Sequence, residues 1–362
     1  MTGSMYAAIA GLQTHMQKMN VIGNNIANAN TYGFKPGITS FSESMYTSIS
    51  NSTAGGAQYG GTNASQIGYG SKVSSIDLNM TGGTYAMTGV PSHLYLNGNG
   101  FFLVGQKSDG VTDPNDLTLK RVGNFSLDSD GYLVDAKGNC VYGFMPLGEE
   151  DTGAIIEGEW DTTLRPIRLP VSAQSSGDPT KDTIPEGTPL YPHLTDQDDG
   201  TAIGYPTDVN GNPVDSENRI DNVNGLNMSV DNNGVVTLTT QDNKSITVGV
   251  IAIGSVINPN GLTKESDGYY KAGNNAGDVT VGTCGQVIGE NKYLNNDDAN
   301  GDNQLLTGVG PTQILSGGLE ASKTDIATEF ADLITTQRGF QANTKIITVT
   351  DEMLSDLVSM KR

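Results

Sequence analysis

The sequence predicts an α+β protein in which one helix at each end of the chain flanks a β-rich middle. Three observations lead to this prediction. Apolar residues near both termini recur at helical spacing. The middle of the chain alternates polar and apolar residues, as strands do. Glycine is frequent, at 47 of 362 residues, and the apolar fraction is only 36%, which indicates short strands joined by many turns.

The C-terminal segment 319–362 carries the clearest helical pattern. Apolar residues recur every seven positions, with a further aromatic residue beside them, and this spacing is typical of a coiled-coil seam. The seam residues are Ile326, Phe330, Leu333, Phe340, Ile347 and Leu354. Ser322 followed by Asp325 predicts the N-cap. A helix reaching Arg362 would be about 60 Å long at ~1.5 Å per residue and would need a packing partner.

The N-terminal segment 1–33 has the same spacing. Its seam residues are Met5, Ile9, Leu12, Met16, Met19 and Ile26. We expect this helix and the C-terminal helix to pair as an inner coiled-coil domain, which would bring the two termini together. Two independent amphipathic helices on a globular core remain the alternative.

The middle of the chain divides by composition. Residues 34–70 are rich in Ser, Thr, Gly and Asn, which predicts an extended linker. Alternation from residue 71 predicts a core β domain with a first half at 71–145 and a second half at 245–318, the latter containing a polar insert at 289–307. The proline-rich, acidic stretch 146–244 predicts a second β-rich domain inserted between the halves.

Charge and apolar patterning exclude several partners. A net charge of −20 argues against binding nucleic acid or an anionic membrane. The longest apolar run, Val248–Ile257, is too short to cross a bilayer, so no membrane insertion is expected. The N-terminus has no basic residue before Lys18 and no continuous apolar core, so a cleaved secretory signal is not expected. Composition alone therefore suggests a soluble cytoplasmic protein.

Residue types give little support for catalysis. Cys140 and Cys284 are too few for a disulfide framework and fit no metal spacing, although one bridge between them remains open. The three histidines suggest neither a metal pair nor a Ser–His–Asp set. They are His15, His93 and His193. We expect no enzyme activity and no cofactor.

One stretch resembles a metal loop. Asn296, Asp298, Asn300 and Gly301 fall at ligand and turn positions of a calcium loop, but the twelfth position is Thr307 in place of the bidentate Glu. No flanking helices are predicted. A loop without a metal is the favoured interpretation.

Motifs near both ends and through the middle recur in a fixed order. The N-terminal stretch 24–35 contributes Asn24, Asn25, Asn28, Asn30, Thr31, Gly33 and Phe34. The C-terminal stretch 337–345 contributes Gln337, Arg338, Gln341 and Asn343. Between them lie the motifs at 88–102, 121–134, 258–262 and 316–322. Together these stretches resemble the flagellar rod and hook axial protein family, and the hook members most closely.

The resemblance implies a structural subunit of the flagellar hook. Such a subunit assembles with copies of itself into a flexible, curved helical tube that couples rotation of the rod to the filament. The implied partners are copies of itself, the distal rod, the hook cap, the hook–filament junction proteins and the flagellar export apparatus. The implied location is extracellular, reached without a cleaved signal peptide. The inserted domain and the Gln-Ala-Asn that follows Phe340 favour hook over the alternative, a distal rod subunit. A secreted β-rich adhesin, binding module or hydrolase is a more remote alternative.

Overall fold

The computed structural model describes residues 2–56, 60–107, 113–128, 131–144, 146–148, 155–160, 164–168, 228–239, 245–284 and 312–360. The chain divides into two compact units, each formed by segments that lie close together. Residues 1–80 and 322–362 form the first, which we call the terminal unit, and residues 81–321 form the second, which we call the β unit.

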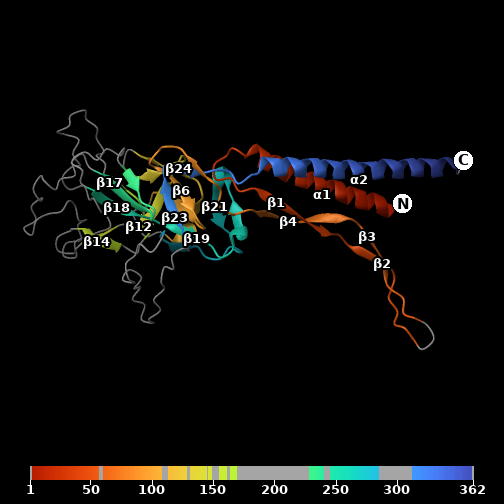
Figure 1. Ribbon diagram of the computed structural model, residues 1–362. Helices are drawn as coiled ribbons and strands as arrows, with labels where there is room; N and C mark the ends of the chain where they lie inside the picture. Colours follow the sequence, from red (N-terminus) through yellow and green to blue (C-terminus); the bar gives the residue numbers. More distant parts are fainter. Residues whose placement is uncertain are drawn as a thin grey trace, which may run out of the picture. The chain divides into compact units, whose positions relative to one another are not determined.

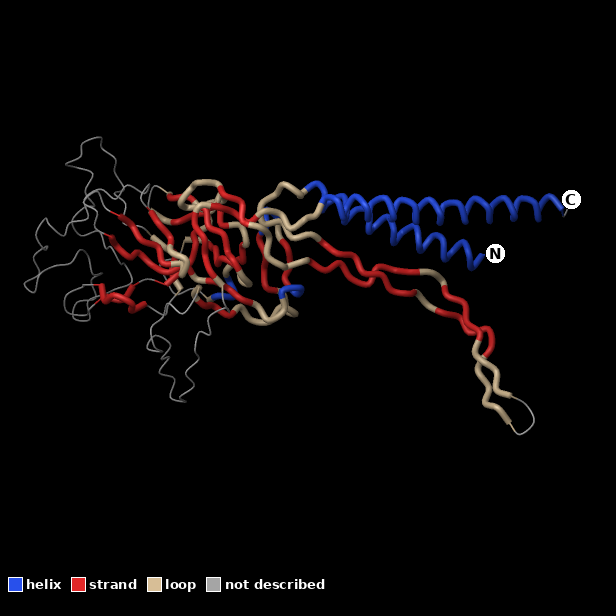
Figure 2. The backbone as a smooth tube through the Cα atoms, in the orientation of Figure 1, coloured by secondary structure: helices blue, strands red, loops and turns tan. Residues whose placement is uncertain are grey.

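The terminal unit combines two long helices with two narrow ribbons. Its helices are α1 (Thr2–Ala27) and α2 (Ile326–Met360). Its strands are β1 (Gly37–Glu43), β2 (Tyr46–Ser50), β3 (Ser65–Gly68) and β4 (Ser71–Leu78). Figure 1 shows α1 and α2 side by side and running in opposite directions, with both chain ends at the same end of the pair. β1 pairs with β4 and β2 pairs with β3, both antiparallel, as the ribbons in Figure 2 show.

The two helices are terminated by polar side chains. α1 ends where Asn28 donates its Nδ2 to the carbonyl of Asn24 at 2.9 Å and Thr31 donates its hydroxyl to Asn28 at 3.1 Å. These bonds give the last turn acceptors and donors outside the helical ladder. Gly33 then takes a φ of 66°, which favours glycine and turns the chain. The asparagine-rich motif therefore stops the helix.

α2 begins later than predicted. Its N-cap is Asp325, whose carboxylate accepts from the Ala327 amide at 3.0 Å and from the Thr328 hydroxyl at 2.8 Å. The prediction of Ser322 as the cap is wrong, because its hydroxyl accepts instead from the Thr324 amide at 3.3 Å in a local turn. An aspartate at the helix start also interacts favourably with the helix dipole.

The structure differs from the predicted extended linker at 34–70, because β1, β2 and β3 all lie in that stretch. β4, which the sequence assigned to the core β domain, pairs with β1 in the terminal unit. One face of this ribbon lies on α1: the hydroxyls of Thr14 and Ser71 are 3.3 Å apart, and a Cβ at Gly37 would lie 3.2 Å from Val21. The alternation in β4 therefore arises from packing on a helix.

The β unit is built on antiparallel strands. Its strands are β5 (Tyr85–Met87), β6 (His93–Asn97), β7 (Phe101–Gly105), β8 (Thr118–Lys120), β9 (Gly123–Asn124), β10 (Ser126–Leu127), β11 (Leu133–Val134), β12 (Cys140–Phe144), β13 (Pro146–Gly148), β14 (Ile155–Trp160), β15 (Arg165–Pro166), β16 (Met228–Val230), β17 (Val235–Thr239), β18 (Ser245–Ile251), β19 (Ile253–Ser255), β20 (Leu262–Lys264), β21 (Tyr269–Ala272), β22 (Thr280–Gly282), β23 (Gln313–Ser316) and β24 (Gly318–Glu320). Short 3₁₀ turns occur at Pro114–Asp116, Pro259–Gly261 and Ser266–Gly268.

The main sheet has the strand order β16-β17-β18-β12-β7-β8-β21-β20. Two smaller sheets, β23-β6-β9 and β24-β5, contribute to the same unit, and β13 pairs with β14. The central strand β7 is a continuous apolar run whose residues are buried, as expected for a strand covered on both faces. The two glycines in the turn before β7, Gly98 and Gly100, have φ values of 135° and 123°, which favour glycine.

Buried apolar side chains from separate sheets form one core. Phe102 and Phe125 meet edge to face with ring centroids 5.2 Å apart. Leu96, Val141 and Ile314, from three different strands, pack into the same cluster. The α+β class predicted from the sequence is therefore confirmed.

The predicted inserted domain is described only in part. β15, β16 and β17 lie within 146–244 but join the main sheet. Residues 169–227, and the polar insert at 289–307, lie outside the described residues.

One buried ion pair closes the β unit at the point where the chain enters and leaves it. Arg121 Nε donates to Glu320 Oε2 at 2.6 Å, and the Gly83 amide donates to Glu320 Oε1 at 2.5 Å. The remaining guanidinium nitrogens donate to the carbonyls of Leu96, Gly98 and Gly100 at 2.6–3.0 Å. Both charged side chains are almost fully buried. Satisfied donors and acceptors on every side make this a stable arrangement for two buried charges.

We expect Glu320→Ala to lower the free energy of unfolding of the β unit by ~3–5 kcal/mol, because it leaves a buried guanidinium without its counter-ion. The measurement is denaturant unfolding of the full chain followed by near-ultraviolet circular dichroism of the tyrosines. Glu265→Ala, which removes an exposed carboxylate from the same unit, is the matched control. Equal effects from the two variants would contradict a special role for Glu320.

Candidate assembly surface

The contact between α1 and α2 is antiparallel and largely polar where it is closest. Asn25 donates to Glu329 at 2.9 Å, and Lys18 forms an ion pair with Asp332 at 3.3 Å. Further along, α1 and α2 approach so closely that a Cβ at Gly11 would lie 2.5 Å from Asn343. The predicted proximity of the two terminal segments is thus found in the structure.

Asn25 joins three elements through one buried amide. Its Nδ2 donates to the Gly37 carbonyl and to Glu329, each at 2.9 Å, and its Oδ1 accepts from the Gly37 amide at 3.0 Å. The end of α1, the start of β1 and the first turn of α2 therefore meet at this side chain. A neutral amide suits the position because both donors and acceptors are required.

The predicted seam residues are partly covered in this helix pair. In the single chain, Ile9, Met16, Ile326 and Phe330 are 39%, 51%, 45% and 49% exposed. The other seam residues, Met5, Leu12, Met19, Ile26, Leu333, Phe340, Ile347 and Leu354, are half-buried. The fully buried side chains of α1 include Ala8, Thr14 and Ile22. The sequence analysis did not select these three residues. Since α1 packs on α2 and on the β1–β4 ribbon together, its buried stripe is displaced from the heptad seam.

Exposed apolar side chains continue beyond the seam. On α2 they include Ile334, Ile346, Val349, Met353, Leu357, Val358 and Met360. On the ribbons they include Ile38, Met45, Tyr46, Ile49 and Ile67. Apolar groups spread over long, narrow elements in this way are typical of a protein–protein interaction surface. We call this set, with the seam residues, the apolar surface of the terminal unit.

The motif residues divide into two groups. Asn24, Asn28, Thr31 and Gly33 shape the end of α1, while the carbonyl of the buried Phe34 accepts from the Lys323 amide at 3.3 Å. Asn30 is exposed in the turn. In α2, Asn343 faces α1, whereas Gln337, Arg338 and Gln341 are exposed. Arg338 donates to Gln341 at 3.4 Å along the helix surface.

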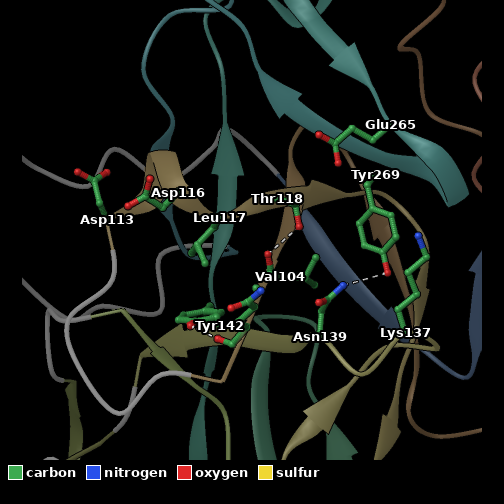
Figure 3. Close-up of a pocket in the computed structure, with 12 residues that line it drawn as sticks. Val104, Asp113, Asp116, Leu117, Thr118, Lys137, Asn139, Tyr142, Glu265 and Tyr269 are labelled. Atoms are coloured by element: carbon green, nitrogen blue, oxygen red, sulfur yellow. Dashed lines mark hydrogen bonds between the residues drawn. The ribbon is translucent and has the colours of Figure 1, made fainter.

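The β unit contains a polar hollow of about 520 Å³, lined in part by Asp113, Asp116, Glu265 and Lys137. Figure 3 shows Tyr269 and Asn139 at its wall, where the two side chains are hydrogen-bonded. The Tyr269 hydroxyl also donates to buried Asp135, and burial together with this bond raises the pKa of Tyr269. The tyrosine is thereby held as a neutral structural donor.

Asp135 is the centre of this buried network. It accepts from Lys120 Nζ at 3.2 Å and from the amides of Lys137 and Asn139 at 2.9 and 3.0 Å. Burial acts to raise the pKa of Asp135, but these donors and the Tyr269 hydroxyl together outweigh it and hold the pKa below its usual value. The carboxylate therefore stays charged and stabilises the fold near neutral pH.

Two of the three histidines and both cysteines lie within the described residues. His15 lies in α1, and His93 in β6 has its Nδ1 2.8 Å from the Thr88 hydroxyl. Cys140 and Cys284 are both free and buried, so the bridge left open by the sequence is not formed, and burial raises the pKa of Cys284 to about 12. His193 and the calcium-like stretch 296–307 lie outside the described residues.

Neither a metal site nor a membrane span is found in the described part of the chain. No group of three or more His, Cys, Asp or Glu side chains there is arranged to hold a metal ion. Neither α1 nor α2 is apolar enough over its length to cross a membrane.

Both ends of the chain match known protein families. Residues 5–35 match the family described as flagella basal body rod protein, and residues 315–360 match the family described as flagellar basal body rod FlgEFG protein C-terminal. These two matches cover most of α1 with its terminating turn, and β24 with α2.

Full-length relatives agree with these matches. The flagellar hook protein FlgE of Borreliella burgdorferi is 27% identical, and the alignment covers 100% of both chains. The flagellar basal-body rod protein FlgG of Bacillus subtilis is 29% identical, again over 100% of both. The hook protein FlgE of Salmonella typhimurium is 26% identical over 99% of this chain and 100% of its own.

The matched segments include both terminal helices, which carry much of the apolar surface of the terminal unit. Both ends of the chain match flagellar rod families, and the chain as a whole is similar to flagellar hook and rod proteins. The resemblance seen in the sequence is confirmed.

We expect Asn25→Asp to destabilise the terminal unit by about 3 kcal/mol, because aspartate cannot donate to Gly37 or Glu329 and places a second carboxylate beside Glu329. Melting of the full chain followed by far-ultraviolet circular dichroism measures the effect. Asn20→Asp, at an exposed position of the same helix, is the control and should melt like the parent. A melt of Asn25→Asp that matches this control would show that the amide is dispensable.

Glu329 should make the helix pair more stable in mild acid. Burial raises the pKa of Glu329, although the bond from Asn25 opposes the shift. The charged form of Glu329 is thus less favourable in the folded chain than in the unfolded chain. The contribution of Glu329 to the free energy of unfolding is therefore greatest below the unfolded pKa of ~4.3, and it is lost as pH rises through the folded pKa. Glu329→Gln should raise the melting temperature at pH 7 and flatten the slope above pH ~4. Glu352→Gln, at an exposed position of the same helix, is the control. If the melting temperature of Glu329→Gln still falls with pH, the pH dependence belongs to another group.

Proposed function

We propose that this chain is the flagellar hook subunit and that it assembles with copies of itself into a flexible, curved helical tube. The observation that carries the proposal is the apolar surface of the terminal unit, which a single chain leaves uncovered. Burying apolar surface supplies ~25 cal/mol per Å², so copies that cover it for one another gain a large driving force for assembly.

The geometry of the surface favours a filament over a closed ring. Its parts differ in kind, because one lies on the α1–α2 pair and the other on the narrow β1–β4 and β2–β3 ribbons. When two different patches of one subunit meet, the contact is head to tail, and it extends into a helix unless the rotation closes. Met5, Leu12, Leu333, Phe340 and the other seam residues are proposed as the groups that pack within and between subunits.

Hook is proposed over distal rod on two grounds. The Gln-Ala-Asn that follows Phe340 resembles the hook members of the family. The stretch 146–244 between the two halves of the β unit is also the place where the sequence predicts an additional outer domain. The distal rod remains the second candidate, because the basal-body rod protein FlgG of Bacillus subtilis aligns with 29% identity over both complete chains.

A hook subunit would serve as a flexible coupling between rod and filament. The partners proposed with it are the distal rod, the hook cap, the hook–filament junction proteins and the export apparatus, with the assembled tube outside the cell. An acidic, glycine-rich β unit suits exchangeable contacts between outer domains, because charged and small residues do not lock a single arrangement. These contacts would let each row of subunits shorten and lengthen as the tube turns.

Deletion of the gene in its own bacterium separates the two candidates. If the protein is the hook subunit, electron microscopy of isolated basal bodies should show complete rods that carry no hook. Truncated rods would instead assign the chain to the distal rod. Normal hooks and rods in the deletion strain would remove the chain from the flagellar axis altogether.

We expect Leu333→Asp or Phe340→Asp to abolish polymerisation, since each places a charge in the half-buried seam. The β unit should remain folded, which near-ultraviolet circular dichroism will show. Thr335→Asp, at an exposed position of the same helix, is the matched control and should still build tubes visible by electron microscopy. Tubes from either seam variant would exclude the seam from assembly.

A further inference from the structure

Two glycines form matching notches in the helix pair of the terminal unit. A Cβ at Gly11 of α1 would lie 2.5 Å from Nδ2 of Asn343, and a Cβ at Gly339 of α2 would lie 2.7 Å from the ring of His15. At either separation a Cβ would force the facing side chain, or the helix that carries it, to shift. Each helix therefore gives up one side chain so that a polar side chain of the other helix can fill the space.

The His15 ring is held by shape. It meets Phe41 of β1 edge to face with centroids 6.2 Å apart, and Gly339 lies on another side. Its Nδ1 is buried, and no described residue forms a hydrogen bond with it. The fit into the glycine notch, together with the ring contact, is thus what places this side chain.

The apolar seam alone does not specify how α1 and α2 align. Its members on α1 include Met5, Met16 and Met19, and methionine adapts to many neighbours. Glycine, by contrast, is a poor helix former, so its use inside two long helices needs a packing reason. The notches supply that reason.

The two notches are reciprocal and equally spaced. Gly11 and His15 are four residues apart on α1, and Gly339 and Asn343 are four apart on α2, so one antiparallel alignment satisfies both contacts. A shift of one heptad would place Gly339 opposite Ala8 or Ile22. Both polar side chains would then face positions that carry their own side chains.

We propose that the Gly11–Asn343 and Gly339–His15 contacts set the register of α1 against α2. This register also decides which part of α2 has no partner within its own chain. The use of that part in assembly rests on the proposed function. Gly11 lies opposite Asn343, so the start of α1 lies near residue 352, and Met353–Met360 extend past it, as Figure 1 shows at the C-terminal end. Leu357, Val358 and Met360 in this extension are exposed and are offered to a second copy.

The register can be measured with a pair of spin labels. Gln17→Cys and Thr335→Cys place labels at exposed positions on the two helices, while Cys140 and Cys284 are buried and do not react. A shift of one heptad moves the helices by about 10 Å along their axes, which pulsed dipolar spectroscopy resolves. The distance is measured in the dilute full chain and again in label-diluted polymers.

We expect Gly11→Ala and Gly339→Ala each to broaden or shift this distance and to slow polymerisation at least tenfold. Gly23→Ala is the matched control, because a Cβ there meets open space, and it should keep the parent distance and rate.

Paired rescue tests the assignment of each notch. His15→Ala should restore the distance in Gly339→Ala but not in Gly11→Ala, and Asn343→Ala should do the reverse. The proposal would be overturned if either alanine restored the distance in both glycine variants, or if neither restored it. It would also be overturned if both glycine variants kept the distance of the parent chain. A defined parent distance in the dilute chain with no polymer under any condition would instead overturn the proposed assembly and leave the register intact.

Discussion

The terminal unit depends on a helix contact in which polar side chains and glycines hold the closest positions. Asn25 ties α1 to both β1 and α2 through one amide, and Lys18 pairs with Asp332. Polar contacts of this kind have narrow geometric requirements, so they define position more sharply than apolar contacts do. Many apolar side chains of the two helices, such as Met16, Phe330 and Ile334, are thereby left exposed, where a neighbour is able to cover them.

Polar contacts also connect the separate sequence motifs of the chain. Arg121, the carbonyls of the turn before β7 and Glu320 come from three separate motifs and meet in one buried network. Asn25 and Asn343, from the two terminal motifs, both take part in the contact between α1 and α2. Residues that look unrelated in the sequence are thus partners in space.

The α+β class, the two terminal helices and their proximity could be predicted, because heptad spacing and strand alternation are local signals. The position of the buried stripe on α1 could not, since it depends on packing against α2 and the β1–β4 ribbon at once. β1–β3 were missed because Ser, Thr, Gly and Gln surround their few apolar residues, and this composition is shared with linkers. The sequence predicted Ser322 as the N-cap of α2, whereas the structure has Asp325. Both residues fit the capping pattern, and only the local turn at Ser322 decides between them.

The buried ion pair of Arg121 and Glu320 also constrains when the chain is able to fold. Its carboxylate binds an amide 237 residues earlier, at Gly83, and Arg121 lies 199 residues before it. Contacts of such long sequence separation carry a large loop-closure cost and form late. The β unit therefore remains incomplete until nearly the whole chain is available, and α1 likewise waits for α2. A subunit that is closed by its last segment therefore stays open until its synthesis is almost finished.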